Sequence, residues 1–225
     1  MNRHVPQKPA GRLSLKSVGG DEALDVLPVF VQATAPTPLG SWLYPRRSMR
    51  EARLPVAFTE LIRQATSVVL AVWGGMPVGG VLWRQCRTGQ ENHPFAALAA
   101  TGHPDNARLA ALASRVTVDH PQEPHDDVLG LAVLPNFQHR HIGRALLATA
   151  SPATSRYLII PAGRWRGLLG QGYLPYGARI DLPHSGPPLQ PMRCAAPDRP
   201  PIPAPGRRRA PRRDPPARVA PAAPG

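Results

Sequence analysis

The stretch Val128–Ala150, V-L-G-L-A-V-L-P-N-F-Q-H-R-H-I-G-R-A-L-L-A-T-A, joins an apolar run to an amphipathic run through a short basic turn. Its first part alternates large apolar and small residues up to Pro135, which is typical of a strand that ends there. From Ile142 onward, apolar residues recur at helical spacing. Backbone N–H groups at the start of such a helix bind anions, and Arg140 and Arg144 add positive charge. The stretch therefore predicts a strand, an anion-binding turn and a helix.

The same residues resemble motif A of the GCN5-related N-acetyltransferases (GNAT), which reads V-x-P-x-x-Q/R-x-x-G-x-G/A along the pyrophosphate-binding turn. Val133, Pro135, Gln138 and Gly143 match that pattern, and R-A-L-L follows as in the family. His141 replaces the first glycine of the turn, so a Cβ and a ring enter the space where the family's backbone approaches pyrophosphate. The alternative is an ordinary strand-turn-helix, because a lone glycine-containing turn is a weak signal.

Further stretches extend the resemblance over most of the chain, toward an actinobacterial branch of the family. They are Pro36–Pro45 with the R-L-P-V-A-F-T-E-L-I-R-Q that follows, Val68–Trp83, His120–His125 and Leu182–Met192. The resemblance implies an α/β protein with the GNAT fold, in which helices flank a mixed central sheet. It also implies acetyl-coenzyme A (acetyl-CoA) as a co-substrate, held by a degenerate pyrophosphate loop.

In this family a splayed strand supplies backbone contacts to the pantetheine arm of the cofactor. By resemblance, those contacts fall on the main chain of Leu131 and Val133, with Ala132 at the bend of the strand. The residues of the pyrophosphate turn would be Gln138, His139, Arg140, His141, Ile142, Gly143 and Arg144. The cofactor site is thus expected along one strand and the turn after it.

The proton acceptor is expected just before that strand. His125 matches the E-P-H lead-in of the branch, and the unperturbed pKa of histidine suits a general base at neutral pH. Glu123 is the second candidate, and Asp126 and Asp127 are further ones. The alternatives are a packed loop histidine for His125 and a solvated turn for the two aspartates.

The family's general acid, a tyrosine in the last helix, has no counterpart here, because Leu168 stands about where it belongs. Tyr173 and Tyr176 could substitute, or could simply be core residues. Two functions of different class remain. The first is an acetyl-CoA-dependent N-acetyltransferase that transfers an acetyl group to an unidentified amine by direct attack in a ternary complex. The second is a catalytically weakened, GNAT-like acyl-CoA binding or interaction protein.

Composition predicts one domain with a basic tail. The chain has 225 residues and a net charge of +13, and 14 of its 30 prolines lie in Pro183–Gly225. Such a segment has too little apolar surface to offset the entropy of ordering. We expect a flexible N-terminus over residues 1–11, a GNAT domain over 12–192 and a disordered Arg/Pro-rich tail over 193–225. No aromatic residue interleaves with the tail arginines, which argues against a dedicated nucleic-acid role.

Cysteine and histidine patterns predict neither a disulfide nor a metal site. Cys86 and Cys194 are too few and too far apart, and the eight histidines form no H-x-x-x-H or H-E-x-x-H arrangement. The start of the chain lacks the apolar core of a secretory signal, and no window approaches the ~18 apolar residues of a membrane span. We expect a cytoplasmic protein with reduced thiols and no membrane association. The oligomeric state is not predicted.

The remaining pattern alternates strands and helices. Besides the strand of motif A, strands are expected at Leu13–Ser17, Ser67–Trp73, Val78–Arg84, Arg156–Pro161 and Tyr173–Asp181. Besides the helix of motif A, helices are expected at Asp21–Ala33, Leu54–Ala65, Asp105–Arg115 and Trp165–Gly170. Pro55 is expected in the first turn of its helix. The G-G-M-P turn of the hairpin is expected to be longer than the tightest type.

Overall fold

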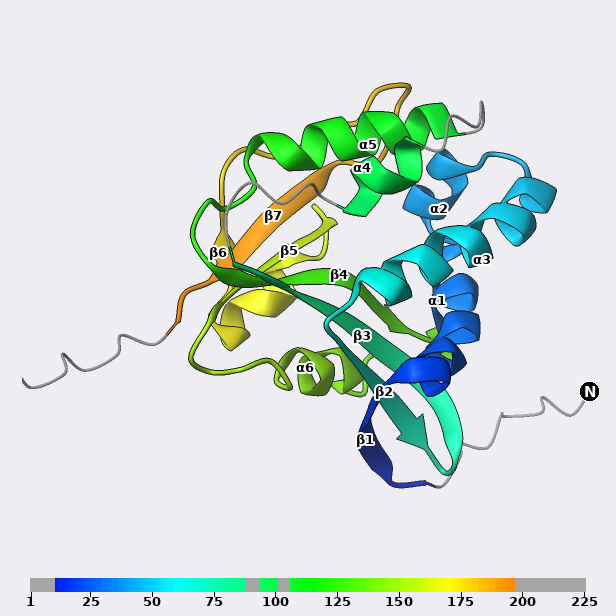
Figure 1. The fold of residues 1–225 in the computed structure, drawn as a ribbon, viewed down its shortest axis with the longest axis vertical. Helices are drawn as coiled ribbons and strands as arrows, with labels where there is room; N and C mark the ends of the chain where they lie inside the picture. Colours follow the sequence, from blue (N-terminus) through cyan, green and yellow to red (C-terminus); the bar gives the residue numbers. More distant parts are fainter. Residues whose placement is uncertain (1–10, 88–93, 101–105, 197–225) are drawn as a thin grey trace, which may run out of the picture.

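The computed structural model describes residues 11–87, 94–100 and 106–196. In this part of the chain, a seven-stranded sheet has the order β1-β2-β3-β4-β5-β7-β6 (Figure 1). The strands are β1 (Leu13–Val18), β2 (Ser67–Trp73), β3 (Met76–Cys86), β4 (His125–Val133), β5 (Ser155–Pro161), β6 (Leu174–Pro175) and β7 (Leu189–Cys194). The pair β4–β5 is parallel and the other described pairs are antiparallel. The expected mixed sheet is confirmed.

Helices cover both faces of this sheet (Figure 1). They are α1 (Leu27–Thr34), α2 (Pro38–Leu43), α3 (Arg47–Gln64), α4 (Pro94–Ala99), α5 (Ala107–Val118) and α6 (Ile142–Leu147), with 3-10 helices η1 (Gly20–Val26), η3 (Pro135–Phe137) and η4 (Trp165–Gln171). Side chains of α1 to α5 join one apolar core, and those of α6 and η4 pack on the other. The domain therefore has three layers. No helix in the described ranges is both long and apolar enough to cross a bilayer.

The sequence of strand β2 is a continuous apolar run because both faces of the strand are covered. Val68 and Leu70 face the core beneath α1 and α3, whereas Val69 and Ala71 face the core beneath α6. Because successive side chains point to opposite faces, a strand covered on both sides must be apolar at every position. The period-2 polar pattern of a half-exposed strand is accordingly missing from this segment.

Helix α1 packs closely on the centre of the sheet. A Cβ on Gly130 in β4 would lie 2.7 Å from Cε1 of Phe30, and one on Gly80 in β3 would lie 3.1 Å from Cε2 of the same ring. The two glycines make room for Phe30, which is 1% exposed. The single helix expected at Asp21–Ala33 is instead divided into η1 and α1, and Pro28 lies in the first turn of α1, where the missing N–H costs no intrahelical hydrogen bond.

Helix α3 begins earlier than expected, and Pro55 lies inside it rather than in its first turn. Proline there removes one i→i−4 hydrogen bond. Polar contacts support the preceding turns: Nε of Arg47 donates to Glu51 at 2.8 Å, and Nη1 of Arg50 donates to the main-chain oxygens of Tyr44 and Pro45 at 2.9 Å each. The helix continues through the proline, with Leu54 buried directly before it and Leu61 and Ile62 buried after it.

The hairpin between β2 and β3 is tighter than expected. Trp73 pairs with Met76, so only Gly74 and Gly75 form the loop. Both have positive φ angles, 56° and 85°, which two-residue hairpin loops of type I′ require and glycine adopts without strain.

The C-terminal part of the domain also differs from expectation. Only Leu174–Pro175 of the strand expected at Tyr173–Asp181 forms β6, because Pro175 and Gly177, with φ of 67°, interrupt it. The main last strand is β7, which lies between β5 and β6 and ends at Cys194. The domain therefore extends past residue 192, and Cys194 is buried rather than part of the tail. Residues 1–10 and 197–225 lie outside the described ranges.

Candidate functional site

Strands β4 and β5 separate soon after they start. Their parallel pairing covers only His125–Asp127 against Ser155–Tyr157. Beyond that point β5 pairs with β7 and β4 keeps only β3. The ladder between β3 and β4 also shifts by one residue at Leu129, which is typical of a β-bulge. The second half of β4 thus has an open edge in the middle of the sheet.

The main chain of Leu131 and Val133 faces this open edge. The N–H of Leu134 donates to the main-chain oxygen of Val78 in β3 at 2.9 Å. Because the main-chain groups of successive strand residues point to opposite sides, the N–H of Ala132 also points to β3, and those of Leu131 and Val133 point away from it. Consistently, Nε2 of Gln138 reaches back to the main-chain oxygen of Val133 at 3.1 Å. The bend was expected at Ala132, whereas the ladder irregularity lies at Leu129.

The turn after β4 adopts a conformation that normally requires glycine. His139 and His141 have φ angles of 61° and 60°, in the left-handed region, and both side chains are exposed. Alternation of right- and left-handed residues turns successive backbone N–H groups toward one side, which forms an anion-binding nest. His141 is the N-cap of α6 but its side chain accepts no capping hydrogen bond. The first N–H groups of α6, which include those of Ile142 and Gly143, are therefore not capped by it.

The two arginines of the turn have different surroundings. The guanidinium of Arg140 lies 5.2 Å from the ring centres of both Trp73 and Phe137, and its buried Nη1 has no hydrogen-bond partner among the described residues. This stacking anchors the turn to β2. Arg144, in the first turn of α6, is exposed. Both arginines were expected to face an anion. Among the described side chains, Arg140 is stacked on two rings, whereas no ring contact holds Arg144.

At the other end of β4, His125 is buried and its tautomer is defined. Its Nδ1 lies 2.8 Å from the main-chain oxygen of Glu123. A carbonyl oxygen only accepts, so Nδ1 carries the proton and Nε2 holds a lone pair. Nε2 is buried with no hydrogen-bond partner among the described residues. Burial lowers the pKa of His125, which keeps the ring neutral.

The carboxylate of Glu123 has a different role from its main-chain oxygen. It forms an ion pair with Arg193 of β7 at the surface. Its pKa is lowered, first by a hydrogen bond from its own backbone N–H and further by Arg193. The Glu123 carboxylate is engaged by Arg193, whereas Nε2 of His125 has no hydrogen-bond partner among the described residues, so His125 is the stronger candidate for the proton acceptor.

The aspartates after His125 lie in β4, not in a solvated turn. Asp127 is 1% exposed, and its Oδ2 lies 3.3 Å from Nη2 of Arg84 on β3 and 3.5 Å from Nε2 of His120. Asp126 is half-buried, and burial raises its pKa. The ring of His120 lies 4.8 Å from that of His125 and 5.1 Å from that of Tyr157. A buried polar cluster therefore lies where β4 and β5 begin to separate.

Sequence reasoning missed Arg84 and His120 and undervalued Asp127. One local signal was available, because Arg84 follows the apolar run Val81–Trp83 and a charge inside a buried strand needs a partner. The identity of that partner depends on the register of β3 against β4, in which Arg84 pairs with Asp127.

Comparison with known proteins addresses the fold. No protein-family model and no curated protein matches the sequence. The histone acetyltransferase HPA2 and related acetyltransferase from Corynebacterium glutamicum superposes with a TM-score of 0.62 and 23% identity, over 84% of this chain and 99% of that one. The polyamine N-acetyltransferase of Drosophila melanogaster gives 0.56 and 16%, over 82% and 100%. Arylalkylamine N-acetyltransferase 2 of Aedes aegypti gives 0.59 and 9%, over 82% and 99%.

This chain has the GNAT fold. The expected α/β architecture is confirmed.

Within this GNAT fold, the two tyrosines expected as substitutes for the general acid are both packed against other side chains. Tyr173 is fully buried in the core beneath α6, and burial raises its pKa to about 12. Tyr176 packs edge-on against Tyr157 at 6.0 Å and under the guanidinium of Arg193 at 5.4 Å. Tyr173 is thus a core residue.

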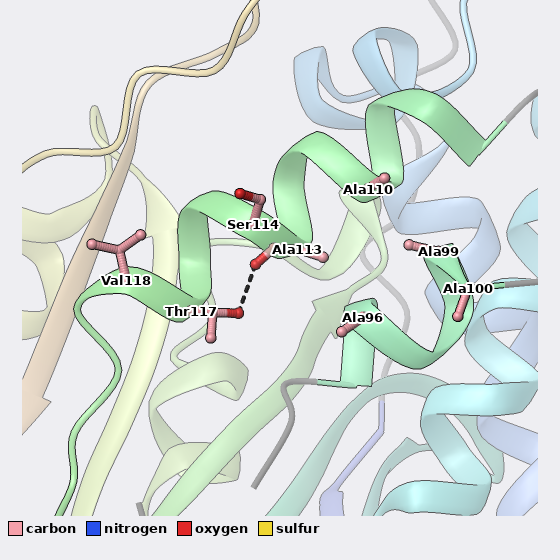
Figure 2. A pocket seen from close by; sticks show the side chains of 8 residues that line it. All are labelled: Ala96, Ala99, Ala100, Ala110, Ala113, Ser114, Thr117 and Val118. Atoms are coloured by element: carbon pink, nitrogen blue, oxygen red, sulfur yellow. Dashed lines mark hydrogen bonds between the residues drawn. The ribbon is translucent and has the colours of Figure 1, made fainter. Parts of the chain in front are cut away.

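A groove lies between α4 and α5, and none of its described lining residues comes from β4 (Figure 2). It has a volume of about 600 Å³ and is lined by small side chains, namely Ala96, Ala99, Ala100, Ala110, Ala113, Ser114, Thr117 and Val118. The Thr117 hydroxyl donates to the main-chain oxygen of Ala113 at 2.7 Å. The described lining residues include no ionisable side chain, so they offer mainly apolar surface and no acid–base group.

Proposed function

We propose that this protein is an acetyl-CoA-dependent N-acetyltransferase. The observation that carries the proposal is the open main-chain edge of β4, which leads into a turn with left-handed residues and the N-terminus of α6. Solved proteins that share the fold include a polyamine and an arylalkylamine N-acetyltransferase. Acetyl-CoA and an amine are the partners that this function requires.

The residues present fit the chemistry of the co-substrate. A pantetheine arm contains amides, and the outward N–H and C=O groups of Leu131 and of Val133, with Ala132 between them, offer complementary donors and acceptors. A pyrophosphate carries negative charge, which suits the N–H groups of the turn and the exposed Arg144. The turn comprises Gln138, His139, Arg140, His141, Ile142, Gly143 and Arg144. In this proposal Gln138 orients the end of β4 and Arg140 holds the turn against Trp73.

The chemistry is the direct attack of a neutral amine on the thioester carbonyl of the co-substrate. The amine nitrogen forms a bond to the carbonyl carbon, its proton passes to a base, and the carbon–sulfur bond breaks to release the thiolate of CoA. We assign the proton to Nε2 of His125, which holds the lone pair because Nδ1 carries the proton in its contact with the main-chain oxygen of Glu123. The carboxylate of Glu123 serves only as the partner of Arg193.

A second function, acyl-CoA binding with weakened or no catalysis, is favoured by two observations. His141 places an imidazole where the family's turn has glycine, and Leu168 stands in place of the family's tyrosine. A side chain at the first position could narrow the phosphate site, and the leaving thiolate would lack an acid. Binding without turnover in an amine screen would favour this alternative.

The experiment is calorimetric titration of the full chain with acetyl-CoA, with desulfo-CoA in a parallel titration. We expect micromolar dissociation constants for both, because neither ligand loses the pyrophosphate. Arg144→Ala should weaken binding roughly tenfold or more, the loss expected for a charged hydrogen bond. Arg115→Ala, an exposed arginine on α5, is the matched control and should bind as the parent does. No detectable heat with either ligand would overturn the transferase proposal and its binding-only alternative.

A further inference from the structure

Three buried side chains with metal-binding atoms meet at the start of β4. They are Cys86 at the end of β3, His120 after α5 and His125 in β4, with exposed fractions of 1%, 7% and 1%. One ligand atom from each lies within 4.8 Å of the other two. Thiolate and imidazole are the ligands that Zn²⁺ prefers in proteins.

The imidazole of His125 is oriented by an outer hydrogen bond, as metal-bound histidines usually are, and a carboxylate lies near the imidazole of His120. Nδ1 of His125 donates to the main-chain oxygen of Glu123 at 2.8 Å. Oδ2 of Asp127 lies 3.5 Å from Nε2 of His120. Such carbonyl and carboxylate partners select the tautomer and leave the other ring nitrogen as the ligand atom.

The lone pair of His125 is the observation that points to a ligand. Nε2 is buried with no hydrogen-bond partner among the described residues, which is costly for a polar atom. A metal ion bound to Nε2 would satisfy it. The ion pair between Arg84 and Asp127, at 3.3 Å, holds β3 and β4 together next to the three ligand atoms.

We propose that Cys86, His120 and His125 form a binding site for Zn²⁺, with a fourth position for water or another ligand. Zn–S and Zn–N bonds of about 2.3 and 2.0 Å place ligand atoms about 3.3–3.7 Å apart in a tetrahedron. From separations of up to 4.8 Å, the three ligand atoms therefore approach one another by about 1.5 Å at most on binding. The thiol of Cys86 loses its proton to solvent, and no other bond changes.

The spacing of these residues in the sequence does not indicate a metal site, and accordingly none was expected from the sequence. The ligands come from three elements, and Cys86 and His125 become neighbours only because they pair across β3 and β4. One consequence rests on the proposed transferase function: Zn²⁺ occupies Nε2 of His125, so it inhibits acetyl transfer.

The test uses the full, tag-free chain after treatment with a chelator, titrated with Co²⁺ as a spectroscopic substitute for Zn²⁺. We expect one equivalent to produce a thiolate-to-Co²⁺ charge-transfer band, which Zn²⁺ then removes. Cys86→Ala should abolish the band, and His125→Gln should weaken Co²⁺ binding at least tenfold. Cys194→Ser, which alters the other buried thiol, and His139→Ala, on the exposed turn, should keep the band.

Absence of the band in the parent chain overturns the metal site, as does a band that survives Cys86→Ala. Circular dichroism of each variant establishes that it is folded. If Cys86→Ala does not fold, the Co²⁺ stoichiometry and the charge-transfer band of the parent chain and of Cys194→Ser still test the site. One equivalent with a band in both supports it, and loss of the band in Cys194→Ser overturns it. Titration with acetyl-CoA is run on the chelator-treated chain, so failure of the metal site and failure of the transferase proposal are separate results.

Discussion

The Nδ1–H of His125 donates to the main-chain oxygen of Glu123, two residues earlier, at 2.8 Å. This contact turns Nε2 toward the interior with its lone pair available. It also separates the roles of the two residues, because the Glu123 carboxylate is engaged with Arg193 while its carbonyl orients the ring.

His125→Gln should lower kcat by about 10²-fold or more, the usual contribution of a general base, with little change in the KM for acetyl-CoA. Glu123→Gln should have a much smaller effect, because it keeps the main-chain oxygen and loses only a surface ion pair worth up to ~1 kcal/mol. The measurement is steady-state kinetics of the chelator-treated enzyme with an accepted amine. Equal losses in both variants would contradict the assignment of the base.

His141→Gly should stabilise the protein. His141 is held at φ of 60°, and the left-handed conformation costs an L-residue about 1–2 kcal/mol that glycine avoids. Part of that gain is offset by the greater freedom of glycine in the unfolded chain, so we expect a net gain of up to about 1 kcal/mol. Urea unfolding measures it. His141→Ala is the control, because it removes the imidazole but keeps the Cβ, and it should give no gain.

Gly130→Ala should destabilise the domain by about 1–3 kcal/mol, because the new Cβ would overlap the Phe30 ring at the interface of α1 and the sheet. Gly143→Ala is the matched control. A Cβ at Gly143 meets nothing within 4 Å, so the helical position should gain about 0.5–1 kcal/mol. Thermal unfolding of the two variants should therefore shift in opposite directions. A stable Gly130→Ala variant would mean that α1 does not pack as closely as described.

The ion pair of Arg84 and Asp127, whose side chains are 9% and 2% exposed, should depend strongly on both partners. Arg84→Met alone leaves a buried carboxylate without its guanidinium and should cost about 3–5 kcal/mol. The double variant Arg84→Met with Asp127→Leu should recover most of that loss, because no buried charge then remains. A double-mutant cycle in urea checks this, and additive losses would argue against a direct pair.

The protein should lose stability at alkaline pH through Tyr173. Burial raises the pKa of Tyr173 to about 12, so the unfolded chain releases this proton near pH 10 while the folded chain retains it. The stability that the neutral hydroxyl contributes is present below pH ~10 and is lost progressively up to ~12, by about 2–3 kcal/mol at most. Tyr173→Phe should be stable at neutral pH and should reduce the alkaline slope in urea unfolding. An unchanged slope would contradict the burial of this hydroxyl.

Several elements were predictable because their signals are local. The strand and turn of motif A, the strands β1, β2 and β5, and the weak helix at η4 follow from apolar period and from proline. The errors have physical causes. Pro55 lies inside α3 because tertiary packing outweighs one lost hydrogen bond. No strand was expected at β7, because Pro191 interrupts its apolar pattern.

The sequence by itself determined the order of strand, turn and helix at Val128–Ala150, because period, proline and glycine act on neighbouring residues. It thereby predicted the positions of Leu131, Val133 and the turn at His141. Only the tertiary structure decided what lies beside them. The register of β3 against β4, shifted at Leu129, brings Arg84 to Asp127 and Cys86 to His125. The separation of β4 from β5 likewise depends on β7 pairing with β5, a contact between segments far apart in the chain that no local pattern encodes.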